Sequence, residues 1–196
     1  LAGVAPVFVG RGKAARMPEG NRHPIYVVVE NVRSLFNVGA IFRSADGVRA
    51  EGVYLTGFTG CPPRKEIHRV ALGAEDSVPW TYIRDPLAAI GDLRAKGVQV
   101  VALERVAEGI DYRSFPYRLP TAVVVGHEVE GLRPETLEAC DGSAQIPMCG
   151  DKTSLNVSVA SGIMLYELLR VVEREGHTAD ASNRSEAVDL GRRSEL

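Results

Sequence analysis

The chain lacks the features that mark several classes of protein. It has three cysteines among 196 residues, widely separated, and neither a CxxC pair nor a combined cysteine and histidine ligand set occurs. This argues against a disulfide-stapled or metal-dependent fold and predicts reduced thiols in the cytoplasm. No run approaches the roughly 18 consecutive apolar residues of a transmembrane helix, so we expect a soluble protein.

An excess of positive charge is also missing. The formal net charge is −2, so overall charge does not indicate a nucleic-acid-binding protein, and any site for a polyanion must come from a local basic cluster. Two clusters qualify, in residues 10–23 and 61–70. For residues 61–70 the alternative, which charge alone favours slightly, is a solvated loop.

The chain does contain short, continuously apolar runs that alternate with helix-like stretches. The runs that predict strands are 25–30, 52–57, 98–104, 121–126 and the shorter 144–148. The stretches that predict helices are 34–46, 85–97 and 154 to about 174. Strands apolar throughout are buried on both faces, so the sequence predicts an α/β domain with a parallel sheet covered by helices on both faces.

The composition divides the chain into three parts. Residues 1–24 form a basic N-terminal arm, and residues 25–173 form the folded domain. Residues 174–196 are nearly free of large apolar side chains, so we expect a polar tail that is flexible or weakly docked. Within the sheet, functional residues are expected in the loops that follow the strands.

The first helix, in "NVRSLFNVGAIFRSADG" (31–47), carries unusual polar chemistry. Ser34 is a suitable N-cap, while Asn37 and Arg43 lie outside the apolar arc, about 120° apart. Gly39 lowers helix propensity but lets another backbone or a ligand approach closely. A surface arginine on an ordinary helix is the alternative for Arg43.

The second motif is "VVVGHEVEGL" (123–132), in which a buried strand leads into Gly126, Glu128 and Gly131. It lacks the middle glycine of a dinucleotide fingerprint, and a carboxylate there would repel a phosphate. The loop suits a ligand that is cationic or rich in hydrogen-bond donors. A glycine-rich loop with a solvated glutamate is the alternative.

The third motif begins at "IPMCGDKTSLNVSVA" (146–160) and continues into the long helix. Ser154 could cap that helix, and polar Asn156 and Ser158 in its first turn are unlike core residues. Along the helix a stripe of apolar and small residues indicates core packing, with Met164 and Tyr166 interpreted as part of it. The stripe comprises Leu155, Val159, Gly162, Tyr166 and Leu169, and Ile163, Met164 and Leu168 widen it.

The order and spacing of these three motifs resemble the SpoU (TrmH-like) branch of the SPOUT RNA methyltransferases, over roughly residues 25 to 172. The resemblance implies transfer of a methyl group from S-adenosylmethionine to a ribose 2′-hydroxyl in tRNA or rRNA, with a slight preference for tRNA. It also implies a C-terminal deep trefoil knot and a homodimer in which the first-motif arginine reaches toward the neighbouring subunit's cofactor.

Residue by residue, the resemblance and the basic clusters give three sets of candidates. Those expected to be catalytic are Arg43, Asn37, Glu128, Ser154 and Asn156. Those expected to bind the cofactor are Leu103, Glu104, Gly126, Glu128, Gly131, Ile146, Met148, Ser154, Leu155 and Asn156. Those expected to bind RNA are Arg11, Lys13, Arg16, Arg22, Arg33, Arg43, Arg64, Lys65 and Arg69.

Arg43 raises a difficulty for the chemistry, because a guanidinium in water stays protonated and is a poor general base. Our hypothesis is that Arg43 binds the adjacent phosphate and lowers the pKa of the 2′-hydroxyl, while a phosphate oxygen or water accepts the proton. Two other functions remain as alternatives. One is a non-catalytic RNA-binding or ribosome-assembly factor, and the other is a nucleotide-dependent oxidoreductase, disfavoured because no GxGxxG follows the first strand.

Overall fold

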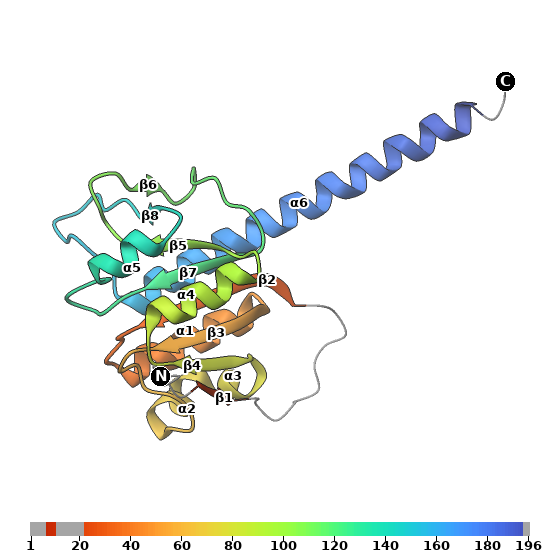
Figure 1. Cartoon of the computed structure of the whole chain (residues 1–196). Helices are drawn as coiled ribbons and strands as arrows, with labels where there is room; N and C mark the ends of the chain where they lie inside the picture. Colours follow the sequence, from red (N-terminus) through yellow and green to blue (C-terminus); the bar gives the residue numbers. More distant parts are fainter. Residues whose placement is uncertain (1–6, 11–21, 194–196) are drawn as a thin grey trace, which may run out of the picture.

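The computed structural model describes residues 7–10 and 22–193 and shows an α/β fold (Figure 1). The described strands are β1 (Val7–Gly10), β2 (His23–Glu30), β3 (Ala50–Thr56), β4 (Trp80–Ile83), β5 (Gln99–Leu103), β6 (Ile110–Asp111), β7 (Thr121–Val125) and β8 (Ser143–Gln145). The described helices are α1 (Leu35–Gly47), α2 (Lys65–Ala71), α3 (Ala74–Ser77), α4 (Pro86–Ala95), α5 (Pro134–Ala139) and α6 (Val157–Arg193).

These strands form one sheet in the order β1-β4-β3-β2-β7-β5-β8-β6. All of its pairings are parallel except that between β1 and β4, which is antiparallel. The predicted parallel α/β sheet is therefore confirmed. Strands β2, β7, β5 and β8 are consecutive neighbours, so the loops that follow them emerge side by side at one edge of the sheet.

Both faces of the sheet are buried, as the continuous apolar runs predict. On β2, Val27 and Val29 pack in a core with α1, α2, α3 and α6, whereas Val28 faces the opposite core with α4. This alternation follows from the two-residue period of a strand. Among the described residues, no helix has the length and apolar character needed to cross a bilayer.

Close packing of α1 against α2 explains one conspicuous glycine. A Cβ built on Gly39 would lie 2.6 Å from the carbonyl oxygen of Ile67 in α2. Any side chain there would push the two helices apart. The glycine therefore serves the approach of another backbone, the first of the two possibilities that the sequence raised.

The segments that the sequence placed outside the domain need two corrections. Residues 7–10 of the expected arm form the edge strand β1, which is too short to give a clear periodic signal. The last helix does not end near Arg174 but continues to Arg193, and Figure 1 shows it extending away from the sheet. The predicted end is too early because it rests on the point where apolar residues stop. Polar residues can continue a helix, since many of them have good helix propensity.

The stripe on α6 that was interpreted as core is wrong in part. Met164 is buried as expected, together with Leu165 and Leu168, but Val159 and Tyr166 are exposed by more than half. The helix has two apolar stripes, and only one faces the sheet. Residues 61–70 also differ from a simple loop, because Lys65–Ala71 form α2.

Candidate active site

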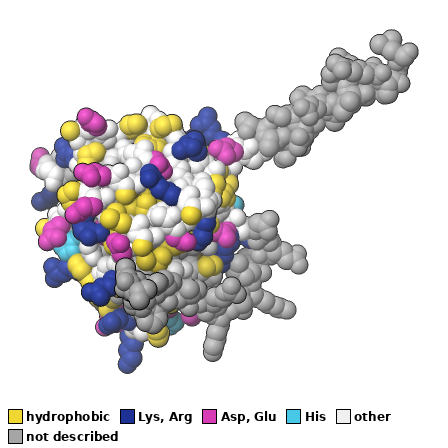
Figure 2. All heavy atoms as spheres, viewed as in Figure 1, with side chains coloured by type: hydrophobic (Ala, Val, Ile, Leu, Met, Phe, Trp, Pro, Cys, Tyr) yellow, Lys and Arg dark blue, Asp and Glu magenta, His cyan; other side chains and the backbone are white. Residues whose placement is uncertain are grey.

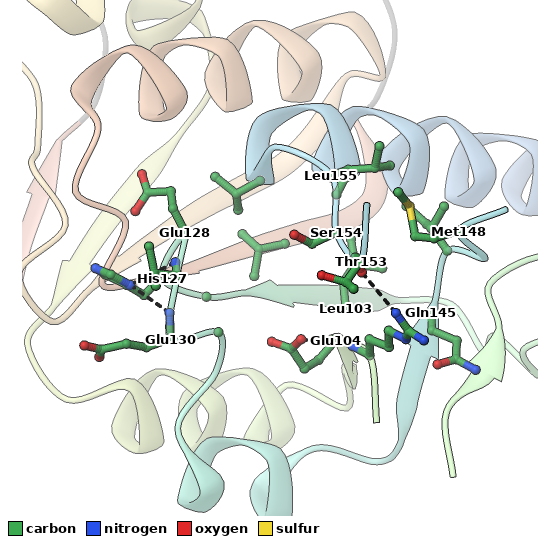
Figure 3. A pocket seen from close by; sticks show the side chains of 18 residues that line it. Leu103, Glu104, His127, Glu128, Glu130, Gln145, Met148, Thr153, Ser154 and Leu155 are labelled. Carbon is green, nitrogen blue, oxygen red and sulfur yellow. Dashed lines mark hydrogen bonds between the residues drawn. The ribbon is translucent and has the colours of Figure 1, made fainter. Parts of the chain in front are cut away.

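A cleft of about 220 Å³ lies at the carboxyl ends of β5, β7 and β8 (Figure 3). Three loops line it: the start of the segment after β5, the whole of Gly126–Gly131 after β7, and much of Ile146–Leu155 after β8. Figure 3 shows Glu128 at one end of the cleft, with Met148 and Gln145 at the other. Parallel strands thus bring the second and third sequence motifs together, as expected for a ligand site in such a sheet.

The loop after β7 folds back tightly on itself. His127 and Gly131 exchange backbone hydrogen bonds of 3.1 and 2.9 Å, and Gly131 has a φ of +71°. A Cβ on Gly126 would lie 2.5 Å from the carbonyl carbon and oxygen of Gly131. Both glycines are therefore dictated by the backbone path of the loop.

Glu104 ties this loop to the segment after β5. Its carboxylate accepts hydrogen bonds from the backbone N–H of Leu132 at 3.1 Å and of Arg105 at 3.0 Å. A Cβ on Gly131 would lie 2.4 Å from the same carboxylate. The two walls of the cleft are held in a fixed relation by a charged acceptor, which makes stronger hydrogen bonds than a neutral one.

Glu128 connects the second motif to the first. Its carboxylate accepts from the backbone N–H of Arg33 at 3.1 Å and of Ser34 at 3.0 Å, and from Nδ2 of Asn37 at 3.0 Å. Burial alone would raise the pKa of Glu128, but these hydrogen bonds together outweigh it and lower the pKa below the ordinary 4.5. Glu128 is therefore ionised at neutral pH and works as a fixed acceptor.

Asn156 extends this network into the third motif. Its Nδ2 donates to Oδ1 of Asn37 at 3.1 Å, and its Oδ1 accepts from the backbone N–H of Ser158 at 2.9 Å. Asn156, not Ser154, therefore caps α6, which begins at Val157. The expected cap is wrong because a serine and an asparagine are both good N-caps, and the sequence does not decide between neighbouring candidates.

Ser154 lies in the wall of the cleft, and within the described part of the chain its hydroxyl makes no hydrogen bond. Ser34, by contrast, caps α1 as predicted, with its Oγ accepting from the backbone N–H of Asn37 at 3.3 Å. Asn37 is thus held at the mouth of the site by its own backbone and by both ends of its side chain.

Arg43 is the predicted catalytic residue that the fold does not bring to this cleft. It lies six residues after Asn37 on an exposed part of α1, about 9 Å further along the helix. It is absent from the cleft lining, and it makes no hydrogen bond or ion pair within the described residues. The other four catalytic candidates lie in the cleft or in the polar network beside it.

All the predicted cofactor-binding residues except Asn156 line the cleft. Sequence reasoning missed several others that line it: Arg105, Val125, His127, Val129, Glu130, Gln145, Thr153, Val157 and Ala160. Most are direct neighbours of motif residues, so their position in a post-strand loop was the available signal. Arg105, for example, immediately follows Glu104 at the end of β5.

The predicted RNA-binding residues are scattered. Arg11, Lys13 and Arg16 lie outside the described residues. Arg22 donates to the backbone carbonyls of Ala50 at 2.9 Å and Ser77 at 2.5 Å, which gives it a structural role. The remaining basic residues, all exposed, are Arg33, Arg43, Arg64, Lys65 and Arg69. Figure 2 shows both signs of charge interspersed over one face of the molecule.

Residues 24–166 match the family described as the SpoU rRNA methylase family. A curated relative, the 23S rRNA (guanosine-2′-O-)-methyltransferase RlmB of Ralstonia nicotianae, is 36% identical over 147 residues, covering 75% of this chain and 59% of the relative. The tRNA (guanosine(18)-2′-O)-methyltransferase of Aquifex aeolicus is 34% identical over 161 residues, covering 81% of this chain and 74% of the relative. The chain therefore spans less than two thirds of the first of these and more of the second.

Solved structures give the same picture. The crystal structure of the A. aeolicus TrmH/SpoU tRNA modifying enzyme is similar with a TM-score of 0.72 and 34% identity, covering 79% of this chain and 78% of that one. The AdoMet-bound rRNA methyltransferase from Sinorhizobium meliloti is similar with a TM-score of 0.71 and 36% identity, covering 76% and 59%. The fold is thus shared with proteins of this kind.

Proposed function

Because the chain belongs to the SpoU rRNA methylase family, we propose that it transfers a methyl group from S-adenosylmethionine to a ribose 2′-hydroxyl in tRNA or rRNA. The observation that supports this best is the hydrogen-bonded series Glu128–Asn37–Asn156, which joins all three motifs beside one cleft. Polar residues that only solvated a surface would not need to converge from three loops. We place the reaction in the cytoplasm, where these RNAs occur.

The cleft suits S-adenosylmethionine better than a nucleotide bearing phosphates. The carboxylates of Glu104, Glu128 and Glu130 lie along it, and they favour a ligand with cationic groups. Leu103, Ile146, Met148 and Leu155 supply apolar wall for an adenine ring. The two loop glycines fix backbone groups at the centre of the cleft, where they can bind the ligand's polar edges.

When bound, S-adenosylmethionine supplies an electrophilic methyl group for an in-line displacement. The chain's contribution is then to position the ribose, since alignment accounts for much of the rate in such reactions. Asn37 and Asn156, held by Glu128 and the α6 cap, form a rigid neutral surface for the sugar. The Ser154 hydroxyl is available to bind ligand. Arg43 binds the phosphate next to the 2′-hydroxyl, and a phosphate oxygen or water takes the proton.

This role for Arg43 needs a second copy of the chain. Arg43 shares a helical face with the half-exposed Phe36, seven residues before it. On α6, Val159 and Tyr166 are exposed to a similar degree, and Tyr166 lies close to Gly47 at the end of α1. We propose that these two stripes form the interface of a homodimer, in which Arg43 completes the partner subunit's site.

The C-terminal trefoil knot that the family resemblance implies is part of the same proposal. Strand β8 lies beside β5 in the sheet. The chain then forms the loop after β8 that lines the cleft, and it continues into α6, which packs against α1. A return of this kind beside the Gly126–Gly131 loop is compatible with threading of a knot. The knot would hold the second and third motifs together.

The direct test is methyl transfer by the purified protein. Tritiated S-adenosylmethionine would be incubated with total tRNA, and separately with total rRNA, from cells that lack the gene. We expect label in one of the two pools, released on complete digestion as a 2′-O-methylated nucleoside. Binding of the cofactor and RNA without transfer would instead indicate a non-catalytic RNA-binding factor. Transfer to a base would contradict ribose methylation.

A further inference from the structure

The loop that follows β3 presents an exposed aromatic ring beside the active site. Phe58 is 61% exposed, and its ring lies edge-on to that of His127 in the second-motif loop, with centroids 6.0 Å apart and planes at 79°. His127 in turn precedes Glu128 of the polar network. Exposed phenylalanines on surface loops are common, so exposure alone does not indicate a function, and the evidence must come from the residues around Phe58.

The backbone that carries Phe58 is held rigidly. Its N–H donates to Oδ1 of Asn31 at 3.1 Å, and the Tyr82 hydroxyl donates to the carbonyl of Gly57 at 2.6 Å. Asn31 and Gly57 both have positive φ, of 56° and 65°, and a Cβ on Gly57 would lie 1.9 Å from the Asn31 Oδ1. Glycine and asparagine are the residues that adopt this left-handed conformation most readily, so the backbone that carries Phe58 follows a defined path.

The same loop is joined to the first motif. Thr59 is buried, its Oγ1 donates to the carbonyl of Val29 at 3.0 Å, and it accepts from the N–H of Val32 at 3.1 Å. Val32 is followed by Arg33, whose N–H binds Glu128. The backbone at Phe58 is therefore held in a defined relation to the polar network that we assign to the ribose, and the ring contact with His127 places the side chain against it.

His127 is fixed as well. Its Nδ1 accepts from the backbone N–H of Val129 at 3.2 Å and of Glu130 at 3.1 Å, as drawn in Figure 3. With Nδ1 as the acceptor, the neutral ring carries its proton on Nε2. The two rings form a pre-organised pair, which lowers the entropic cost of binding a flat ligand.

Exposed cations lie on both sides of this pair. Arg33 lines a shallow cleft with Asn37, His127 and Glu128, while Arg64 lines another with Phe58, Trp80 and Tyr82. Neither guanidinium makes a hydrogen bond or ion pair within the described residues. Aromatic rings between cationic side chains are the arrangement by which proteins bind unpaired nucleic-acid strands, through base stacking and phosphate contacts.

We propose that Phe58, supported by His127, stacks against an unpaired nucleobase within one nucleotide of the methylated ribose, with Arg33 and Arg64 binding the flanking phosphates. This deepens the proposed function and rests on it. The stacking surface selects RNA that is single-stranded or opened at the target. It also places the ribose beside Asn37 by holding the neighbouring base.

Binding to two ten-residue probes separates stacking from phosphate contact. The probes are an adenosine RNA oligomer and an abasic ribose-phosphate oligomer of the same length. We expect Phe58→Ala to weaken binding of the adenosine oligomer roughly five- to 150-fold, since stacking of one base contributes that much. Binding of the abasic oligomer should not change. Phe58→Tyr, which keeps the ring, should restore binding, and Leu87→Ala, an exposed residue on α4, is the matched control.

Turnover measurements distinguish failure of this proposal from failure of the proposed function. We expect Phe58→Ala to raise KM for the RNA pool that the wild type methylates, with unchanged affinity for S-adenosylmethionine. If the wild type methylates RNA and the variant keeps its KM, the stacking surface is wrong while the methyltransferase stands. If the wild type transfers no methyl group, the proposed function fails by itself. A loss of self-association in Phe58→Ala, measured by sedimentation, would make the ring a protein interface and overturn the proposal.

Discussion

At the scale of single residues, Asn156 combines two tasks that can be separated. Its Oδ1 caps α6, and its Nδ2 donates to Asn37. Aspartate keeps the capping oxygen, and its charge is favourable at a helix N-terminus, but it has no Nδ2 donor. The side chain therefore allows a test in which stability and chemistry should respond differently.

We expect Asn156→Asp to keep the wild-type free energy of unfolding within about 0.5 kcal/mol but to lower kcat on saturating RNA roughly tenfold or more. Its carboxylate would face Oδ1 of Asn37 and disturb the link to Glu128. Asn156→Ala should lose both properties, with about 1 kcal/mol of stability lost with the cap. Urea unfolding and single-turnover kinetics measure the two effects. Wild-type turnover in the aspartate variant would remove the Asn156–Asn37 bond from the mechanism.

Glu128 makes a prediction about pH. Its pKa in the folded protein is lower than the ordinary 4.5, so the unfolded state binds the proton more tightly. The stability contributed by the ionised carboxylate is fully present above pH 4.5 and is lost as the pH falls through the folded-state pKa. The difference in unfolding free energy between wild type and Glu128→Gln should therefore be constant from pH 7 to 5. Below pH 4.5 the wild type should lose stability relative to Glu128→Gln, because its carboxylate becomes protonated. A difference that stays the same from pH 7 to well below 4.5 would show that the network does not depend on charge.

At the scale of elements, two glycines that look alike in the sequence have opposite roles. Gly126 directly follows β7, where an added Cβ would meet backbone atoms of Gly131 and Leu132 at 2.5 to 2.6 Å. Gly91 lies on the exposed side of α4, where an added Cβ would meet nothing within 4 Å. One glycine is required by its loop and the other only weakens its helix.

We expect Gly126→Ala to deform the cofactor loop and to weaken binding of S-adenosylmethionine about tenfold or more, because the contacted atoms are backbone and cannot move aside cheaply. Gly91→Ala should leave that affinity unchanged and raise the free energy of unfolding by up to about 1 kcal/mol. Calorimetric titration of the cofactor and urea unfolding check both variants. Normal cofactor affinity in Gly126→Ala would show that the tight turn is not needed for the site.

The elements also show how far the sequence could be interpreted. The parallel sheet, the N-cap Ser34 and the convergence of three post-strand loops follow from local patterns, namely apolar runs, capping residues and glycines after strands. The short strands β1, β4 and β6 do not, because two to four residues give no usable period. The apolar pattern of α6 also cannot show which of its two apolar stripes faces the sheet. A stripe that packs in the core and a stripe that would pack against a partner contain the same types of residue.

At the scale of the whole molecule, Arg43 is the candidate catalytic residue that lies outside the cleft formed by a single chain. Helical periodicity placed it correctly on a flank of α1, but no property of one chain indicates where that flank is directed in an assembly. The exposed side chains of Phe36, Val159 and Tyr166 support our proposal that a homodimer interface completes the site. That hypothesis can be tested by combining two chains whose sites are impaired by different substitutions.

Coexpression of Arg43→Ala and Asn156→Asp chains, each with its own tag, gives mixed dimers that tandem purification isolates. If Arg43 acts on the partner's site, one site of each mixed dimer combines an intact Asn156 with an intact Arg43. Each isolated mixed dimer should then have about half of the wild-type turnover, while either variant alone should keep about a tenth or less. If Arg43 acted within its own chain, both sites would carry one defect and the turnover of the mixed dimer would be as low as that of its parents. The Arg43→Lys homodimer, in which both sites receive lysine, asks whether the planar guanidinium or only its charge is required, and we expect it to lose turnover because lysine cannot bind a phosphate through two parallel hydrogen bonds.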